Sequence, residues 1–249
     1  MHTDRLLFLD LAFDTPALDE LLARLRQVTG QAPFRYLVTP NVDHVVRLHG
    51  DASAAKLLPA YAAAQYCLCD SRILAALARM CGIRLSVIPG SDLTELIFAR
   101  LLEDGDRIAV VGADDAVVQA LRSRYPRIDI VHHVAPMGLA RDAAARRRAA
   151  SFIAEQKARF TFICVGSPQQ EMIAAEAAQM PGSRGLALCV GASLEFLTGH
   201  VQRAPLLMRR LGLEWAHRLA ANPARLWKRY LVEGPRIFAL TYRWAVKRQ

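Results

Sequence analysis

The sequence lacks the features that mark several common classes of protein. Its five cysteines form no Cys-x-x-Cys pair and lie in apolar runs, so we expect buried, reduced thiols in a cytoplasmic protein, with neither a disulfide framework nor a zinc site. No uncharged apolar stretch reaches the length of about 18 residues that a membrane-spanning helix needs. The N-terminal stretch contains Asp4, Arg5 and Asp10 and no long apolar run, so we expect no secretory signal.

A glycine-rich dinucleotide-binding fingerprint is also missing. Residues 111–113 read Val-Gly-Ala ahead of a helical pattern, but they supply only one of the fingerprint's glycines, which disfavours an NAD-dependent oxidoreductase. Residues 104–106 read Asp-Gly-Asp, which is a metal-binding triplet in one class of sugar-nucleotide transferases and also an ordinary turn between a helix and a strand. We favour the turn, and we expect no metal ion and no cofactor.

Acidic residues are scarce in the last fifth of the chain. Residues 203–249 carry eleven of the 32 lysines and arginines, two of the 23 acidic residues and all three tryptophans. The rest of the chain is neutral overall, so the whole net charge of +9 lies in this segment. Basic residues interleaved with aromatic ones suit a membrane surface or another polyanion. Nucleic acid is disfavoured as a partner, because no base-stacking motif appears in the rest of the sequence.

Residues 1–202 alternate between apolar strand patterns and amphipathic helix patterns. We predict strands at residues 6–13, 34–39, 66–69, 107–111, 128–134, 160–165 and 185–190. We predict helices at residues 14–30, 42–49, 52–64, 71–81, 91–102 (capped by Ser91), 114–124, 141–159 and 168–180. Such alternation predicts an α/β core of Rossmann-like type, with a mostly parallel sheet and helices on both faces. A basic, aromatic, helical appendage at residues 203–249 would follow this core.

Open α/β sheets bind their ligands outside the carboxyl ends of the strands. That rule nominates the residues that follow the predicted strands, namely Thr39, Asn41, Asp70, Gly112, residues 166–171 and Gly191. Asp70 suits a general base, but an aspartate at a strand end also commonly caps the next helix. Residues 166–168 read Gly-Ser-Pro, which suits either a phosphate at a helix N-terminus or plain helix capping. Both pairs of alternatives remain open at this point.

Short stretches along almost the whole chain resemble the WecG/TagA/CpsF glycosyltransferases (glycosyltransferase family 26). In the core these stretches are Thr39-Pro40-Asn41, Asp43-His44, Cys69-Asp70, Gly90-Ser91-Asp92-Leu93, residues 165–171 and Val190-Gly191-Ala192. In the appendage they are Arg203-Ala204-Pro205, Leu-Gly-Leu-Glu-Trp at residues 211–215, Arg218-Leu219, Asn222-Pro223, Arg225-Leu226 and residues 228–231. The appendage set, in this order after an α/β core, is the more specific of the two.

The resemblance implies an inverting, metal-independent glycosyltransferase. Its donor would be a UDP-sugar of N-acetylmannosamine type, the corresponding uronate or a glucose-type sugar, and its acceptor a polyprenyl-diphosphate-linked saccharide. Such a reaction serves bacterial exopolysaccharide or envelope-glycan synthesis. The resemblance also implies a cytoplasmic enzyme that the appendage holds on the anionic inner face of the cytoplasmic membrane, and it allows a homo-oligomer.

By its motifs, the resemblance assigns the general base to Asp70 and catalytic roles to Thr39 and Asn41. It implies substrate contacts at Gln170, Glu171, Gly112, Gly166, Asp92, Gly191, Arg218, Arg225, Lys228 and Arg229. Arginine side chains and helix N-termini suit the departing diphosphate, because both present fixed N–H donors. The spacings of seven and three residues from Arg218 to Arg225 and on to Lys228 predict one helix face turned towards that diphosphate.

Four positions depart from the family pattern. Ser71 and Ile73 stand where the family has glycine, Val87 where it has arginine, and Glu195 where it usually has aspartate. A serine fits position 71 only if the backbone there does not require a positive φ. Because these positions surround the sugar-donor side, we keep an alternative: a catalytically impaired paralogue that binds lipid-linked glycan intermediates or another polyanion.

Overall fold

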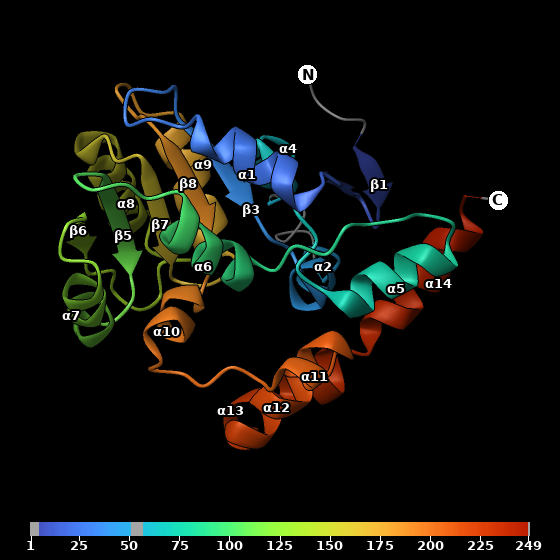
Figure 1. Cartoon of the computed structure of the whole chain (residues 1–249). Helices are drawn as coiled ribbons and strands as arrows, with labels where there is room; N and C mark the ends of the chain where they lie inside the picture. The colour runs from blue at the N-terminus through green and yellow to red at the C-terminus, as the bar shows by residue number, and fades with distance from the viewer. Residues whose placement is uncertain (1–4, 51–56, 249) are drawn as a thin grey trace.

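A six-stranded parallel sheet forms the centre of the molecule (Figure 1). The computed structural model describes residues 5–50 and 57–248. The strands of the sheet are β3 (Arg35–Val38), β4 (Tyr66–Cys67), β5 (Arg107–Gly112), β6 (Asp129–His133), β7 (Phe160–Cys164) and β8 (Leu186–Cys189). Their order is β4-β3-β8-β7-β5-β6, and every neighbouring pair is parallel. The predicted fold class is therefore confirmed.

Helices cover both faces of this sheet. One apolar cluster packs against the face that carries α1 (Leu18–Arg26), α6 (Gly90–Arg100) and α7 (Asp115–Arg124). A second cluster includes residues of α2 (Val42–Leu48), α4 (Leu58–Ala62), α5 (Arg72–Met80), α8 (Ala143–Gln156) and α9 (Gln169–Ala178). Successive residues of a central strand point to opposite clusters, as Val110 and Val111 do in β5. Strands that are buried on both faces consist of continuous apolar sequence. The apolar runs therefore predicted where these strands lie.

The chain reverses its direction of winding between β5 and β7. After β5 it runs through α7 to β6, and after β7 it runs through α9 to β8 on the other side. Because α7 and α9 lie on opposite faces, the carboxyl ends of β5 and β7 border the crevice at which such sheets bind ligands. Gly112 ends β5 with a φ of 78°, and a Cβ atom there would stand 2.5 Å from Val165 Cγ1. Only glycine fits this strand end.

Two local predictions are wrong. Residues 6–13 form a hairpin of β1 (Leu6–Phe8) and β2 (Leu11–Phe13), because Leu9 and Asp10 turn the chain with positive φ. Helix α6 begins at Gly90, directly after Pro89, so Ser91 lies inside the first turn and does not cap it. Of the helix predicted at residues 52–64, residues 52–56 lie outside the described residues, and α4 forms the rest.

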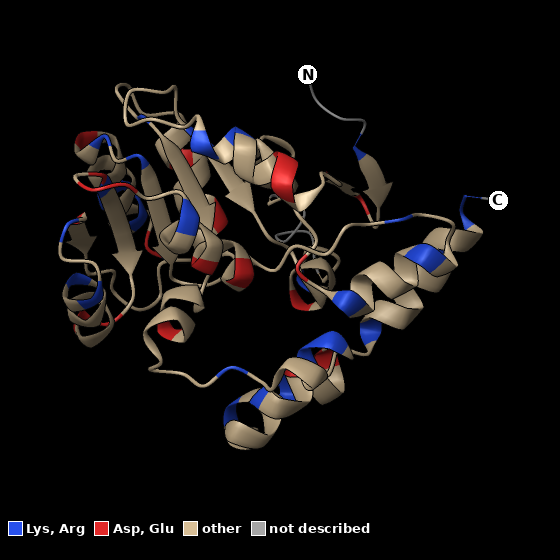
Figure 2. Ribbon diagram, viewed as in Figure 1, with Lys and Arg blue, Asp and Glu red and all other residues tan. Residues whose placement is uncertain are grey.

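The appendage, residues 203–248, is a series of short helices in which basic residues are frequent (Figure 2). Its elements are α11 (Leu206–Arg210), α12 (Glu214–Ala221), α13 (Pro223–Trp227), the π-helical turn η1 (Lys228–Glu233) and α14 (Arg236–Val246). The expectation that Arg218, Arg225 and Lys228 share one helix face is wrong. Helix α12 ends before Pro223, so these three residues belong to three successive elements.

Helix α14 packs against the core with one face and leaves the other exposed. Ile237 is 1% exposed, Thr241 is also buried, and the Trp244 ring meets Phe8 edge-on, with 5.2 Å between the ring centroids. Tyr242, on the opposite face, is 72% exposed. Within the described part of the chain, no helix combines the length and the apolar composition that a membrane crossing requires.

Candidate active site

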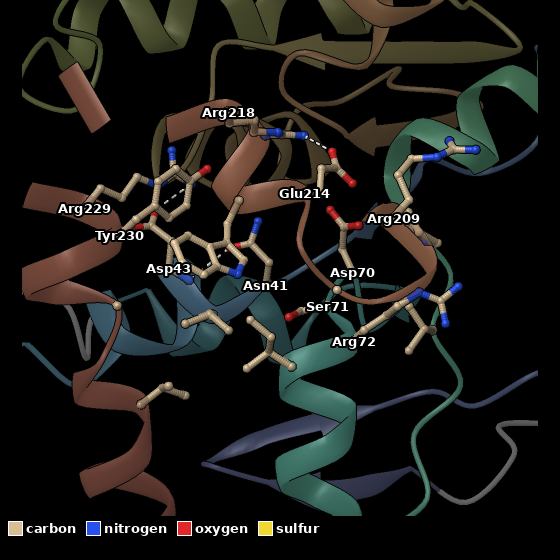
Figure 3. Close-up of a pocket in the computed structure, with 18 of the residues that line it drawn as sticks. Asn41, Asp43, Asp70, Ser71, Arg72, Arg209, Glu214, Arg218, Arg229 and Tyr230 are labelled. Carbon is tan, nitrogen blue, oxygen red and sulfur yellow. Dashed lines mark hydrogen bonds and ion pairs between the residues drawn. The ribbon is translucent and has the colours of Figure 1, made fainter. Parts of the chain in front are cut away.

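A cavity of about 620 Å³ lies between the core and the appendage (Figure 3). The core lines it with residues that follow strands β3 and β4, among them Asn41 and Asp70. The Asp70 N–H donates a hydrogen bond of 3.0 Å to the Pro40 carbonyl oxygen, which holds these two strand ends side by side. The appendage forms the opposite wall. The structure thus brings together two of the three predicted catalytic residues.

Asp70 does not cap the helix that follows it. Ser71 is the N-cap of α5, and its Oγ accepts a hydrogen bond of 3.2 Å from the Leu74 N–H. The backbone of Ser71 is extended, with a φ of −149°, so serine replaces the family's glycine there without strain. The serine therefore takes over the capping role and leaves the Asp70 carboxyl free. Figure 3 shows that carboxyl in the cavity, near Glu214.

The surroundings of Asp70 raise its pKa from 3.8 to about 8. Burial is the largest cause, and the nearby carboxylates of Glu214 and Asp92 add to it, while Arg218 and Arg203 oppose it. An aspartate with such a pKa is a far stronger proton acceptor than one in water. It also changes charge near neutral pH, as a general base should.

Five arginines of the appendage line the cavity, and carboxylates hold four of them. Arg203 Nη2 lies 2.6 Å from Asp92 Oδ1, and Arg209 Nη1 lies 3.3 Å from the same oxygen. Arg218 Nη2 lies 2.6 Å from Glu214 Oε1. Arg229 Nη2 lies 3.0 Å from Asp43 Oδ2. The predicted contacts Asp92, Arg218 and Arg229 are therefore at the cavity, whereas Arg203 and Arg209 are additional.

These four guanidinium groups have further unused donors. The Nε atoms of all four are buried and have no hydrogen-bond partner among the described residues. Buried donors without partners are rare in folded proteins, and several of them around one cavity indicate a site for an anionic ligand. A phosphate or diphosphate group would supply the acceptors that these atoms lack. Figure 3 shows Arg209, Arg218 and Arg229 arranged around the space that Asp70 faces.

Three of the predicted site residues lie beneath the cavity, in the buried core. Thr39 Oγ1 donates to the Cys189 carbonyl oxygen at 3.1 Å, and Gln170 Nε2 donates to Glu171 Oε1 at 2.9 Å. The Gly191 N–H donates to Gln170 Oε1 at 3.0 Å. These bonds connect the ends of β3 and β8 to the start of α9. In this arrangement Thr39, Gln170 and Glu171 support the residues above them.

His44 joins this buried layer to Asn41, and the sequence did not identify it as a site residue. Asn41 Oδ1 caps α2 by accepting from the N–H groups of Asp43 and His44, at 3.0 and 3.4 Å. His44 Nδ1 lies 2.8 Å from Asn41 Oδ1, and its Nε2 lies 3.6 Å from Glu171 Oε1. Burial lowers the pKa of His44, which favours the neutral ring. The spacing Asn-x-x-His at a helix start is the signal that could have found it.

The remaining predicted residues do not line the cavity. Gly112 and Gly166 lie at the ends of β5 and β7, on the crevice described above. Burial and Asp114 raise the pKa of Glu195, which follows β8, and the charge of Arg225 opposes that rise. Arg225 itself is exposed. Lys228 is exposed, and its Nζ lies 3.8 Å from Glu233 Oε1.

The Asp-Gly-Asp triplet at residues 104–106 is a turn, as favoured from the sequence. Asp104 pairs with Arg127 at 2.9 Å, and Asp106 accepts from the Glu103 N–H at 2.8 Å. The turn leads into the amino end of β5, at the edge of the sheet opposite the cavity. Within the described residues, no group of three or more His, Cys, Asp or Glu side chains is arranged to hold a metal ion.

Comparison with known protein families gives one match that covers almost the whole chain. The family described as "Glycosyl transferase WecG/TagA/CpsF family" matches residues 6–249. The matched range includes the parallel sheet, the cavity and the appendage.

Proposed function

The chain belongs to the WecG/TagA/CpsF glycosyltransferase family, and from that premise we propose that it transfers a sugar from a UDP-sugar to a polyprenyl-diphosphate-linked saccharide. The transfer occurs in the cavity between Asp70 and the appendage, inverts the anomeric centre and needs no metal ion. The donor sugar is of N-acetylmannosamine type, its uronate or of glucose type. The observation that carries the proposal is that one cavity joins a carboxyl of raised pKa to four arginines with unused donors.

The proposed reaction is a single in-line displacement. The acceptor hydroxyl oxygen forms a bond to the anomeric carbon while the bond from that carbon to the β-phosphate oxygen breaks. UDP leaves with the bonding electron pair, and Asp70 accepts the proton of the acceptor hydroxyl. One carboxylate is sufficient for this role, whereas hydrolases of glycosides use two. The raised pKa of Asp70 suits it to take a proton near neutral pH.

Arginines of the cavity, with Arg218 among them, stabilise the charge that develops on UDP. Fixed guanidinium groups can donate two parallel hydrogen bonds to phosphate oxygens, and they need no rearrangement when the bond breaks. Arg218 suits this role, because it lines the same cavity as Asp70 and its charge opposes the rise in the pKa of that carboxyl. The carboxylates that hold these arginines fix their positions until the diphosphate binds.

The appendage also serves membrane association in this proposal. Its exposed apolar side chains include Leu206, Leu207, Leu211, Trp227, Leu231, Phe238 and Tyr242. Cationic side chains lie among them, as Figure 2 shows for the same helices. This combination supports peripheral binding to an anionic bilayer. In our proposal such binding brings the cavity mouth next to lipid-linked substrates on the inner face of the cytoplasmic membrane.

A screen of UDP-sugars tests the donor part of the proposal. A ligand at a hundred times its Kd should stabilise the protein by about 2.7 kcal/mol, which a melting curve resolves. UDP and at least one UDP-sugar should raise the melting temperature, and that sugar should be transferred to a short-chain polyprenyl-diphosphate saccharide in the presence of EDTA. Stabilisation without any transfer would favour the impaired paralogue instead.

A further inference from the structure

Three arginines of the cavity fall into two groups that lie against different parts of the core. Arg203 and Arg218 both pack over the ring of Phe196, with 5.8 and 5.0 Å from the guanidinium carbon to the ring centroid. Phe196 belongs to α10 (Ser193–Thr198), the helix that follows β8. Arg229 is paired instead with Asp43 of α2, the helix that follows β3. The two groups therefore lie against the helices that follow two different strands, β8 and β3.

Arg229 has the properties of an anion-binding residue in its own right. It is partly buried, its guanidinium carbon lies 5.5 Å from the centroid of the Tyr230 ring, and Tyr230 in turn packs near Trp215. Asp43 is its one ion-pair partner among the described residues, and its buried Nε has no partner there. Asp43 also holds Arg47 at 2.9 Å, so its negative charge is shared between two arginines. Arg229 thus retains donors for a further anion.

The cavity wall next to Arg229 is apolar and leads to the surface. Leu231 and Phe238 line the cavity and are 55% and 58% exposed, while Pro235 lies between them in the sequence. By contrast, Arg203 and Arg209 also border an adjoining hollow of about 460 Å³ whose lining includes the polar residues Ser91, Glu95 and Gln202. The hollow beside Arg203 and Arg209 therefore adds polar groups on that side, whereas Leu231 and Phe238 give the Arg229 side an exposed apolar wall.

We infer that Arg229 forms a diphosphate subsite for the lipid-linked acceptor, separate from the Arg203–Arg218 subsite that holds the diphosphate of the nucleotide donor. The isoprenoid chain of the acceptor leaves the cavity over Leu231 and Phe238. This inference rests on the proposed function, because it divides the two substrates of that reaction between the two arginine groups. It brings the acceptor sugar and the donor sugar together at Asp70, where the acceptor hydroxyl must lose its proton and the donor sugar its bond to UDP.

Binding of two simple probes to the full chain tests the division. UDP represents the donor and farnesyl diphosphate the acceptor, and titration calorimetry measures each alone and in the presence of the other. Both should bind the wild-type protein together. Arg229→Gln should weaken the binding of farnesyl diphosphate by about 10–100-fold and change the Kd of UDP by less than about 2-fold. The reason is that a charge-assisted hydrogen bond to phosphate is lost in the acceptor subsite only. Arg203→Gln should show the reverse pattern.

Matched variants separate binding from folding. Arg79→Gln removes an exposed cation near the far end of α5 and should change neither affinity. Arg229→Lys keeps the charge but loses the paired donors, and it should fall between wild type and Arg229→Gln. Phe238→Ser should weaken the binding of farnesyl diphosphate but leave the binding of inorganic diphosphate unchanged, because it removes only an apolar contact for the isoprenoid chain.

Each outcome decides a different statement. Mutual exclusion of UDP and farnesyl diphosphate, or equal weakening of both by Arg229→Gln, would show one shared subsite and overturn the inference while leaving the proposed function standing. No binding of farnesyl diphosphate to the wild-type protein would also overturn it. Binding of farnesyl diphosphate that depends on Arg229, together with no binding of UDP or any UDP-sugar, would support the subsite but refute the proposed donor.

Discussion

Replacement of Asp70 by asparagine should make the protein more stable, and the gain should grow with pH. The pKa of Asp70 rises from 3.8 to about 8 on folding, so folding disfavours the ionised carboxyl. Below about pH 4 the carboxyl is protonated in both states and has no such cost. As the pH rises towards 8 the unfolded chain ionises first, and the wild-type protein loses stability across this window. Asparagine stays neutral throughout and avoids the loss.

The size of the effect follows from the same shift. Each pKa unit corresponds to about 1.36 kcal/mol, so about four units set an upper limit of roughly 5–6 kcal/mol above pH 8. Asp70 is only partly buried and arginines lie nearby, so solvent and counter-charges reduce this limit. We expect Asp70→Asn to gain about 1–3 kcal/mol more at about pH 8.5 than at about pH 5.5.

Urea unfolding of wild type and variant at the two pH values measures this difference directly. Glu155→Gln is the control, because Glu155 is exposed on α8, away from the cavity, and its replacement should change stability by less than about 0.5 kcal/mol at either pH. An equal gain at both pH values, or a less stable Asp70→Asn protein at the higher pH, would refute the account of the Asp70 environment.

Three further predictions concern catalysis and packing. Asp70→Asn should lower kcat by about 10²–10⁴-fold while UDP still binds. In steady-state assays the wild-type kcat/KM should rise with pH to a plateau above about pH 8, because the Asp70 carboxyl ionises. A flat pH profile would contradict the assignment of Asp70 as the general base. Arg218→Ala should abolish transfer even to a water-soluble acceptor in detergent, whereas Lys228→Ala, which alters an exposed side chain, should retain most of it in the same assay. Ile237→Ala should lower the free energy of unfolding by about 2–5 kcal/mol, because it leaves a cavity at a buried position. Phe238→Ala, on the exposed face, should lower it by less than about 1 kcal/mol yet weaken binding to anionic vesicles. Similar losses of stability for both variants would refute the assigned faces of α14.

The strands and most helices were predictable because their signals are local. The apolar runs that became β5 and β7 need burial on both faces, and only the middle of a parallel sheet provides it. The strand-end rule correctly grouped Asn41 with Asp70, because neighbouring parallel strands end at one edge. Whether Asp70 caps the following helix, however, could not be decided from Asp70 and its place at a strand end alone. It depended on Ser71 taking the cap, which the family pattern of glycine at that position concealed.

The contacts between the core and the appendage were not predictable from the sequence. Arg203 reaches Asp92 across 111 residues, and no short-range pattern identifies such a partner. The helix-face argument for Arg218 and Arg225 failed for a reason present in the sequence, since Pro223 removes an N–H that a continuous helix would need. A spacing of seven residues places two side chains on one helix face only if the helix between them is uninterrupted.

The contact of Trp244 with Phe8 has a consequence for the order in which the protein matures. A ribosome releases the chain from its N-terminus at about 5–20 residues per second, so the first hairpin waits for nearly the whole length before its aromatic partner emerges. The appendage residues that line the cavity are also synthesised late, after the strands of the sheet. Nascent chains can therefore form the parallel sheet before the arginines of the appendage close the cavity.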